Sequence, residues 1–515
     1  MARTSVSGYC WPQSVAPGGS FGLHLSANTG SLAVEIARIG RRREVVLRID
    51  DLAVGDHPVP ADASANGCDW PAAVTVDVAD VWMSGYYEIL LSGERDGRVV
   101  QDRAFVVVGP SPDTDRSTVL VLGTNTWHAY NDFGGSNLYN GGTQVSLQRP
   151  MAAGYLFKPP GLGRRVASEH PPDVRIAAHI GYLTINQLSQ WAGSAGWPNW
   201  EHPFVSWAEG DGYAFDVVTN ADLDADPGLL SRYRLMLSVG HDEYWSGPMR
   251  DTVEAFIANG GNVGFLSGNT SFWQVRFEDE GRTMVGFKQR FQDDPCYGSE
   301  RAGDVTSIWS DHEIGRPENT MTGVSFARGG YARIGRRVPA GSGGYTIHRP
   351  DHWLFEGTEL EYGDLLGARA TIVGYECDGC DFTYRDGLPY ATGSDGTPDG
   401  FEILGTSPAA SFTRETAARP PEPGALSELE FHAWRIFGDH GAESTARLAN
   451  GHAVLGTYSR NGTVVTTGCT DWAMGLAARD PQVEQVTRNI LDRLGAEGPR
   501  PGPDPVGAAH RVGSG

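Results

Sequence analysis

The hydrophobic positions of the chain follow two patterns, and the change falls near residue 110. Before it, short runs rich in β-formers, such as 20–26, 86–92 and 103–109, are separated by Gly, Pro, Asp and Asn. Several short strands at this spacing are typical of two packed sheets. We therefore predict an immunoglobulin-like β-sandwich over residues 1–110, which a Pro-containing linker at 109–115 joins to the rest of the chain.

From residue 117 onward, apolar runs alternate with helical stretches. The predicted strands are 119–122, 214–219, 235–239 and 262–266, and the predicted helices are 202–210, 226–233 and 248–259. Buried strands that alternate with helices indicate a parallel sheet. Ser246 is a suitable N-cap for the third helix, and Pro248 fits its first turn. The fold class is therefore α/β, with this parallel-sheet domain extending over 115–495.

Two segments interrupt the alternation of strands and helices. The segment 131–200, rich in Gly, Pro, Asn and Trp, is predicted to be irregular, and 300–440 is predicted to be a β-rich insertion. A strand at 463–467 and a helix over 481–495, capped by Asp480, resume the pattern. Residues 496–515 are rich in Pro and Gly and are predicted to be a disordered tail.

Side chains that can do chemistry gather where two neighbouring strands are predicted to end. His241, Asp242 and Glu243 follow the strand 235–239, and Ser-Gly-Asn-Thr at 267–270 follows the next strand. In open α/β sheets, ligands bind outside the carboxyl ends of the strands. This turn can supply a metal ligand through Glu243 and a general base through His241. The alternative is that all three residues only stabilise the N-terminus of the following helix.

Three further features extend this prediction. The segment 124–132, TNTWHAYND, follows the first strand of the domain and is either the wall of a binding site or a packed loop. Asn269 can donate a hydrogen bond to a developing oxyanion. Lys288 can balance negative charge at the site, although a single lysine is more often a solvated surface charge.

Charge and cysteine content narrow the classes of function. The chain has 515 residues and a formal net charge of −22, which disfavours binding to nucleic acid. We expect no membrane segment, because no apolar run is long enough, and the N-terminus lacks the apolar core of a signal peptide. The six cysteines are expected to be reduced thiols of a cytoplasmic protein. The alternatives are a disulfide between Cys10 and Cys68 or a zinc or redox role for Cys377 and Cys380.

Several segments between about residue 115 and 495 match one known family. They are TNTWHAYNDFGGSNLY (124–139), VGHDEYWS (239–246), GGNVGFLSGNTSFWQVRFE (260–278), FKQRFQDDP (287–295), VGYECDG (373–379), GFEILGTSP (400–408) and TGCTDWAMGL (467–476). Together they resemble the large (beta) subunit of N,N-dimethylformamidase and its relatives. The spacing between VGHDEYWS and SGNT is the most specific part of this resemblance.

The resemblance implies a glutamine-amidotransferase-like α/β domain without the catalytic cysteine of that class. It also implies hydrolysis of a small amide at a mononuclear iron ion, Fe3+, held by two tyrosines and one glutamate. Carried over to this chain, Glu243 is the carboxylate ligand and Tyr130 the first phenolate. For the second phenolate, Tyr155 is the first choice and Tyr139 the alternative.

The remaining roles implied by the resemblance concern proton transfer and charge. His241 is the acid–base group, and Asn269 and Lys288 are supporting polar residues. Phenolate and carboxylate are hard oxygen donors that suit a hard Lewis acid. Such an ion polarises a carbonyl and acidifies water, while His241 passes a proton to the leaving amine. The implied partners are a small amide and a separate small subunit, with homo-oligomerisation left open.

A non-catalytic binding module is the competing hypothesis. The chain has 14 tryptophans, and the aromatic segment 184–207 would suit stacking against sugar rings. Under this hypothesis the chain recognises a carbohydrate or a protein. One fold hosts many functions, so the choice depends on the ionisable groups at the strand ends, which favour an enzyme.

Overall fold

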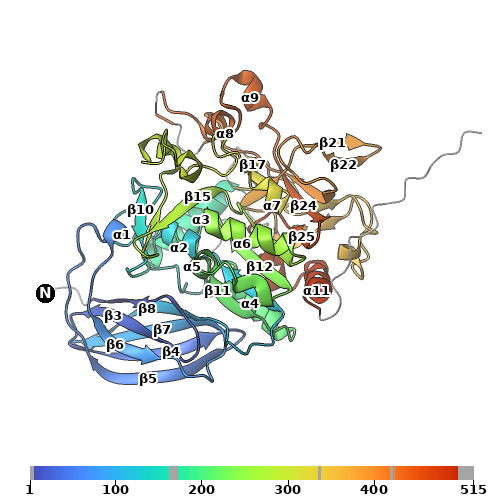
Figure 1. Cartoon of the computed structure of the whole chain (residues 1–515). Coiled ribbons are helices and arrows are strands. Elements are labelled where there is room, and N and C mark those ends of the chain that lie inside the picture. Colours follow the sequence, from blue (N-terminus) through green and yellow to red (C-terminus); the bar gives the residue numbers. More distant parts are fainter. Residues whose placement is uncertain (1–4, 162–171, 335–337, 418–420, 423, 497–515) are drawn as a thin grey trace, which may run out of the picture.

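The computed structural model describes residues 5–161, 172–334, 338–417, 421–422 and 424–496. These residues form a mixed α/β protein with several sheets (Figure 1). The predicted tail at 496–515 lies outside the described residues except for Ala496.

Two sheets form the N-terminal part of the chain, drawn in blue in Figure 1. The first has the order β1 (Val6–Trp11), β3 (Ser20–Ala27), β6 (Ala72–Asp77), and the second has the order β2 (Ser14–Val15), β8 (Arg98–Val108), β7 (Gly85–Arg95), β4 (Ser31–Ile39), β5 (Arg43–Ala53). Leu25 of the first sheet and Ile36 and Ile89 of the second share one buried core. β3, β7 and β8 confirm the three strands predicted in this region.

A nine-stranded sheet organises the rest of the chain. Its order is β11 (Asp216–Thr219), β9 (Thr118–Leu122), β12 (Leu235–His241), β14 (Asn262–Gly268), β25 (Thr463–Thr466), β24 (His452–Ser459), β23 (Glu402–Pro408), β18 (Tyr345–Ile347), β19 (Leu365–Leu366). The first five strands are parallel, as predicted, and the others pair antiparallel. The segment 300–440 supplies β18, β19 and β23, so it extends this sheet.

Most of the remaining elements pack around this sheet or connect its strands (Figure 1). The helices are α1 (Ala63–Asn66), α2 (Thr124–Tyr130), α3 (Pro172–Ile185), α4 (Glu201–Gly210), α5 (Asn220–Ala225), α6 (Gly247–Ala258), α7 (Asn319–Thr322), α8 (Glu428–Phe437), α9 (Ala442–Ala446), α10 (Trp472–Ala477) and α11 (Pro481–Gly495). The other strands are β10 (Gln144–Ser146), β13 (Tyr244–Ser246), β15 (Trp273–Glu278), β16 (Thr283–Val285), β17 (Ser325–Tyr331), β20 (Glu376–Gly379), β21 (Phe382–Arg385) and β22 (Leu388–Ala391). Short 3-10 turns span Leu229–Arg232, Lys288–Asp293, Ala302–Asp304, Trp353–Phe355 and Ala368–Ala370.

The parallel strands are buried on both faces. Leu120 and Leu237 pack in one core cluster with Val486 of α11, whereas Val121 packs in a second cluster with Val253 of α6. Successive side chains of a strand point to opposite faces of the sheet. A strand covered on both faces therefore needs a continuous apolar run, which is the pattern seen in the sequence.

Three sequence predictions about local structure were wrong. The segment 131–200 was predicted to be irregular, but it contains the strand β10 and the 14-residue helix α3. The segment 226–233 holds only the 3-10 turn Leu229–Arg232, preceded by α5. The segment 124–132 was predicted as a loop, but residues 124–130 form α2. Its Thr, Asn and Trp residues are weak helix formers, and burial of all seven residues overrides that preference.

The helix α2 buries an uncharged histidine, which predicts a loss of stability in acid. The Nε2 of His128 lies 2.8 Å from Oε1 of Gln13, so the neutral ring donates this hydrogen bond. Burial lowers the pKa of His128 to about 3. The unfolded chain takes up a proton below about pH 6.5, whereas the folded chain does so only near pH 3, so stability falls between these values.

Replacing this histidine should flatten that decline. The variant His128→Gln keeps a donor for Gln13 but does not titrate. Below about pH 6.5, we expect its free energy of unfolding to fall less steeply with decreasing pH than that of the wild type, by up to about 1 kcal/mol per pH unit. Urea unfolding at a series of pH values measures this slope. Parallel pH profiles for the two proteins would contradict the assignment.

The start of α6 is fixed by a capping serine, as the sequence predicts. The Oγ of Ser246 accepts a hydrogen bond from the N–H of Met249 at 3.3 Å, and Pro248 lies in the first turn. We expect Ser246→Ala to lower the free energy of unfolding by about 1 kcal/mol, because a backbone N–H loses its acceptor. Chemical denaturation measures this change, and an unchanged midpoint would argue against the cap.

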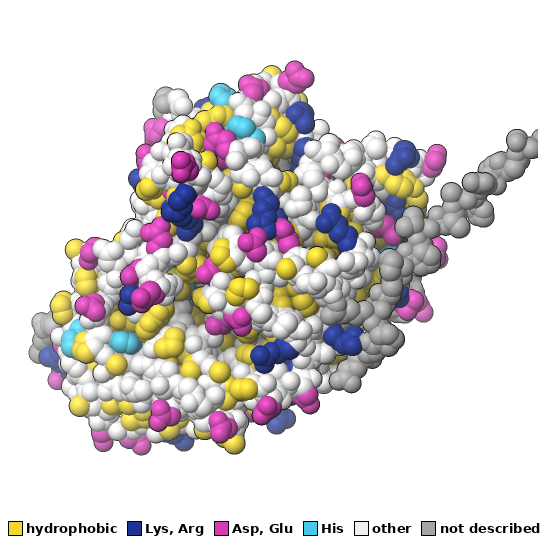
Figure 2. All heavy atoms as spheres, in the orientation of Figure 1, with side chains coloured by type: hydrophobic (Ala, Val, Ile, Leu, Met, Phe, Trp, Pro, Cys, Tyr) yellow, Lys and Arg dark blue, Asp and Glu magenta, His cyan; other side chains and the backbone are white. Residues whose placement is uncertain are grey.

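The surface carries charges of both signs. Figure 2 shows acidic and basic side chains interspersed with apolar ones on the visible face. Among the described residues, no helix is both long and apolar enough to pass through a bilayer. All six cysteines are buried free thiols.

Candidate active site

The carboxyl ends of β12 and β14 lie level with each other and carry the candidate site. His241 is the register partner of Gly268, which precedes Asn269. The side chains of His241 and Glu243 converge, with 3.3 Å between Nε2 and Oε2. The cap of α6 is Ser246, so helix capping does not explain the polar turn at 241–243.

The backbone around this turn is closely packed. A glycine is required at position 240, because its φ is +85° and a Cβ there would lie 2.4 Å from Trp200. The N–H of Glu243 donates to Oγ1 of Thr126 at 2.9 Å, which ties the turn to α2. Asp242 points away from Glu243 and accepts a hydrogen bond from Ser238 at 2.9 Å. Asp242 therefore supports the turn, while its two neighbours form the site.

Three side chains surround the carboxylate of Glu243. The hydroxyl of Tyr139 lies 2.7 and 3.0 Å from the two carboxylate oxygens, and the indole N–H of Trp273 donates to Oε1 at 2.8 Å. Burial acts to raise the pKa of Glu243, but His241 outweighs burial and, with Lys288, holds this pKa below its usual value. Glu243 is therefore a buried, charged carboxylate.

His241 is held between two carboxylates. Its Nε2 lies 2.7 Å from Oε2 of Glu376 and 3.3 Å from Oε2 of Glu243, while Nδ1 lies 2.7 Å from the carbonyl oxygen of Ser194. All these partners are acceptors, so both ring nitrogens carry protons. Burial opposes the charged ring, but Glu376 and Glu243 outweigh it and raise the pKa of His241 well above its usual value. The ring is therefore a buried imidazolium.

Glu376 belongs to this site but was missed by the sequence prediction. It is the first residue of β20, and besides His241 it accepts a hydrogen bond from Nδ2 of Asn269 at 3.0 Å. Its nearest neighbours in sequence do not mark it as chemically special. The one available signal was its position inside the matched segment 373–379.

Asn269 presents an unpaired acceptor at the site. Its Nδ2 lies 3.4 Å from Nε2 of His241, and its Oδ1 is buried without a hydrogen-bond partner among the described residues. Its N–H donates to Asp378 at 2.7 Å, and its φ is +51°. A Cβ on Gly268 would lie 2.5 Å from the backbone of Thr470, so no larger residue fits at this position. The free Oδ1 can accept a hydrogen bond from an N–H group of a ligand.

The structure brings Tyr139, rather than Tyr155, to Glu243. The hydroxyl of Tyr155 donates to the carbonyl oxygen of Tyr130 at 2.6 Å, so it supports the backbone there. The ring of Tyr130 lies 4.3 Å from that of Tyr139 and 5.7 Å from that of His241, centroid to centroid. Of the three tyrosines considered as ligands, Tyr130 and Tyr139 are therefore the pair near the buried carboxylate.

Lys288 is a buried part of the site and not a surface charge. Its Nζ donates to the hydroxyl of Tyr244 at 2.8 Å and lies 3.0 Å from the ring centroid of Tyr139. Burial lowers the pKa of Lys288 to about 7, although the carboxylates of Glu243 and Glu376 oppose this shift. The amine can therefore gain or lose a proton near neutral pH.

The chemistry of the donor set fits a hard cation. Burial and the charge of Glu243 raise the pKa of both Tyr130 and Tyr139 well above the usual value, so these phenols ionise only if a cation is bound. Two phenolates and one carboxylate are hard oxygen donors suited to Fe3+. Within the described part of the chain, no cluster of three or more His, Cys, Asp or Glu has the geometry of a metal site. Phenols are a different type of donor.

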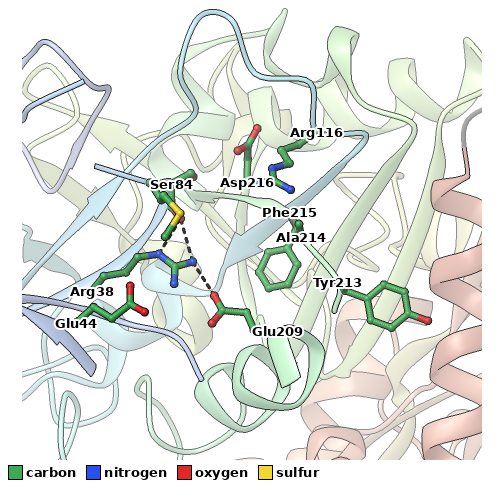
Figure 3. Close-up of a pocket in the computed structure, with 10 residues that line it drawn as sticks. Arg38, Glu44, Ser84, Arg116, Glu209, Tyr213, Ala214, Phe215 and Asp216 are labelled. Carbon is green, nitrogen blue, oxygen red and sulfur yellow. Dashed lines mark hydrogen bonds and ion pairs between the residues drawn. The ribbon is translucent and has the colours of Figure 1, made fainter. Parts of the chain in front are cut away.

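A separate cavity of about 230 Å³ lies where the N-terminal sheets meet α4 (Figure 3). Arg38 crosses it to Oε1 of Glu209 at 2.6 Å and donates to the carbonyl of Ser84 at 3.3 Å. Figure 3 shows Arg116 beside Asp216 on the same wall. The ion pair between Arg38 and Glu209 joins the two parts of the chain. The cavity shares no residue with the cluster around Glu243.

The fold and the site define a mixed α/β protein with a buried acid–base cluster at its strand ends. A family model described as "N,N-dimethylformamidase beta subunit-like, C-terminal" matches residues 33–486, and the chain belongs to this family, as the motifs predicted. The N,N-dimethylformamidase beta subunit of Alcaligenes sp is 24% identical over 330 residues. That of Paracoccus aminophilus is 23% identical over 333 residues. Each match covers 59% of this chain and 38% of the relative.

Proposed function

We propose that this chain hydrolyses the C–N bond of a small amide at the cluster of His241, Glu243 and Glu376. The observation that carries the proposal is the imidazolium of His241, buried between two carboxylates. Ionisable groups with strongly shifted pKa values in a buried cluster are typical of catalytic sites. The two relatives are N,N-dimethylformamidase beta subunits, which supports the same reaction class.

The side chains suggest a division of roles in the reaction. Water attacks the carbonyl carbon, Glu376 accepts the proton that the water loses, and His241 donates a proton to the nitrogen as the C–N bond breaks. The products are a carboxylic acid and an amine. The free oxygen of Asn269 positions an N–H of the substrate or of the departing amine. Lys288, with a pKa of about 7, adjusts the charge of the site.

We infer that the cofactor is an iron ion, Fe3+, held by Tyr130, Tyr139 and Glu243. Such an ion would polarise the amide carbonyl and acidify a bound water. The contact of the Tyr139 hydroxyl with both carboxylate oxygens supports its choice over Tyr155.

We also propose finer descriptions of the fold and the assembly. The N-terminal sheets would be an immunoglobulin-like sandwich over 1–110, and the main sheet a glutamine-amidotransferase-like domain over 115–495. The shared core of the two N-terminal sheets and the five parallel strands support these descriptions. The relatives are named as beta subunits, which supports a further subunit as partner.

The binding-module hypothesis rested on the aromatic segment 184–207, and most of the tryptophans in this segment are buried. Trp197, Trp200 and Trp207 are core residues, and only Trp191 in this group is half-buried. Buried indoles cannot stack on a sugar ring, so the aromatic segment 184–207 does not offer a carbohydrate platform.

A panel of small amides tests the proposed function. Purified chain is incubated with formamide, N-methylformamide, N,N-dimethylformamide and acetamide, and both the released amine and the released acid are measured. Equal amounts of amine and acid, formed by the wild type, would support hydrolysis. Absence of both products for iron-loaded protein, with or without a purified small-subunit partner, would contradict it.

A further inference from the structure

A third carboxyl group, that of Glu428, lies near the cluster without a role in the proposed reaction. Glu428 is the first residue of α8, and it accepts hydrogen bonds from the N–H of Phe412 and from the side chain of Tyr331. Its Oε1 is buried without a hydrogen-bond partner among the described residues. An unpaired buried acceptor costs about 1–3 kcal/mol, which a ligand with a donor group would recover.

A row of aromatic rings links Glu428 to His241. The ring of Tyr331 lies 4.3 Å from that of Phe412 and 6.4 Å from that of Tyr375, and the ring of Tyr375 lies 6.0 Å from that of His241. Tyr331 is the last residue of β17, and α8 lies close to this strand in Figure 1. The ring centroids of Phe326 in β17 and His432 in α8 are 5.9 Å apart, which confirms that the strand and the helix are neighbours.

The charge distribution indicates that Glu428 belongs to the same interior as the cluster. Burial raises the pKa of Glu428 to about 8, with a further contribution from the charge of Glu376. Burial raises the pKa of Tyr331, and the charges of Glu428 and Glu376 add to this shift. Both carboxyl groups are therefore near enough to Tyr331 to act on its hydroxyl. Glu243 and Glu376 already pair with His241, whereas Oε1 of Glu428 is free to accept a hydrogen bond from a ligand.

We propose that Glu428 determines substrate specificity by binding an N–H or ammonium group that the substrate carries a few bonds away from the scissile amide. This inference rests on the proposed function, because it places the reacting bond at His241 and the second polar group at Glu428. The preferred substrates would be amides that also bear an amine, and amides of similar size without a second donor would be poorer ones.

A matched pair of probes tests this specificity. N-(2-aminoethyl)formamide and N-propylformamide have nearly the same length, and only the first ends in a donor. For the wild type we expect kcat/KM and the calorimetric affinity to favour the aminoethyl compound by about tenfold, which corresponds to about 1.4 kcal/mol. Glu428→Gln should abolish this preference, because glutamine cannot ionise to pair with an ammonium group, while values for the propyl compound stay within about twofold.

Controls distinguish binding at Glu428 from the proposed hydrolysis and from non-specific attraction of a cationic probe to the negatively charged chain. Glu443→Gln removes an exposed carboxylate and should keep the preference, and measurements at physiological salt screen the net charge of the chain. If calorimetry shows the preference and its loss in Glu428→Gln but neither amide is hydrolysed, the subsite stands and the hydrolase proposal fails. Equal binding of the two probes by the wild type, no binding of either, or an unchanged preference in Glu428→Gln would overturn the subsite.

Discussion

Replacing Glu243 with glutamine is expected to lower kcat for amide hydrolysis by at least about 10³-fold. The carboxylate accepts hydrogen bonds from Tyr139 and Trp273 and contacts the imidazolium of His241. Glutamine keeps the size of the side chain but removes the negative charge that both the imidazolium and a bound cation require. The initial rate of amine release, measured for wild type and variant under iron-saturating conditions, tests this expectation.

A buried carboxyl outside the cluster provides the matched control. Glu318 accepts a hydrogen bond from Ser310 at 2.6 Å and is fully buried, as Glu243 is. We expect Glu318→Gln to change stability and leave kcat of the folded protein nearly unaltered. An equal loss of rate in the two variants would indicate that the loss comes from impaired folding. Full activity in Glu243→Gln would show that Glu243 has no role in the mechanism.

His241→Asn is expected to lower kcat by about 10²–10⁴-fold, the usual contribution of a positioned acid–base group. The variant should also change the pH profile. The pKa of His241 is raised, so the imidazolium persists at neutral pH, and the wild-type rate should fall only as the pH rises through that raised value. His241→Asn should lose this basic limb, because asparagine does not titrate.

His348→Asn serves as the control for this variant. His348 is buried and its Nε2 lies 2.8 Å from Oγ1 of Thr406, away from the cluster. Its replacement should preserve both the rate and the basic limb. A wild-type basic limb that survives unchanged in His241→Asn would show that another group supplies the proton.

The parts of the fold that could be predicted from sequence are those with a local signal. Continuous apolar runs gave the parallel strands, and Ser246 with Pro248 gave the start of α6. The convergence of His241 with Glu243 followed from their position at a strand end. In each case the information lies within a few neighbouring residues.

The parts that could not be predicted depend on contacts between distant segments. Glu376 reaches His241 only because β20 folds back beside the main sheet, and no local pattern marks it. The helix α2 forms because its neighbours bury it, against the weak helix preference of its residues. The choice between Tyr139 and Tyr155 needed the direction of each hydroxyl, which sequence spacing does not encode.

Iron binding by single-tyrosine variants tests the central claim most directly. We predict that purified wild-type chain binds a single iron ion and shows a visible phenolate-to-iron absorption band. Tyr139→Phe should lose that band and most of the metal, whereas Tyr155→Phe, which removes only a hydrogen bond to the Tyr130 carbonyl, should keep both. Colourless wild-type protein that takes up no iron, or a band lost in Tyr155→Phe and kept in Tyr139→Phe, would contradict the account.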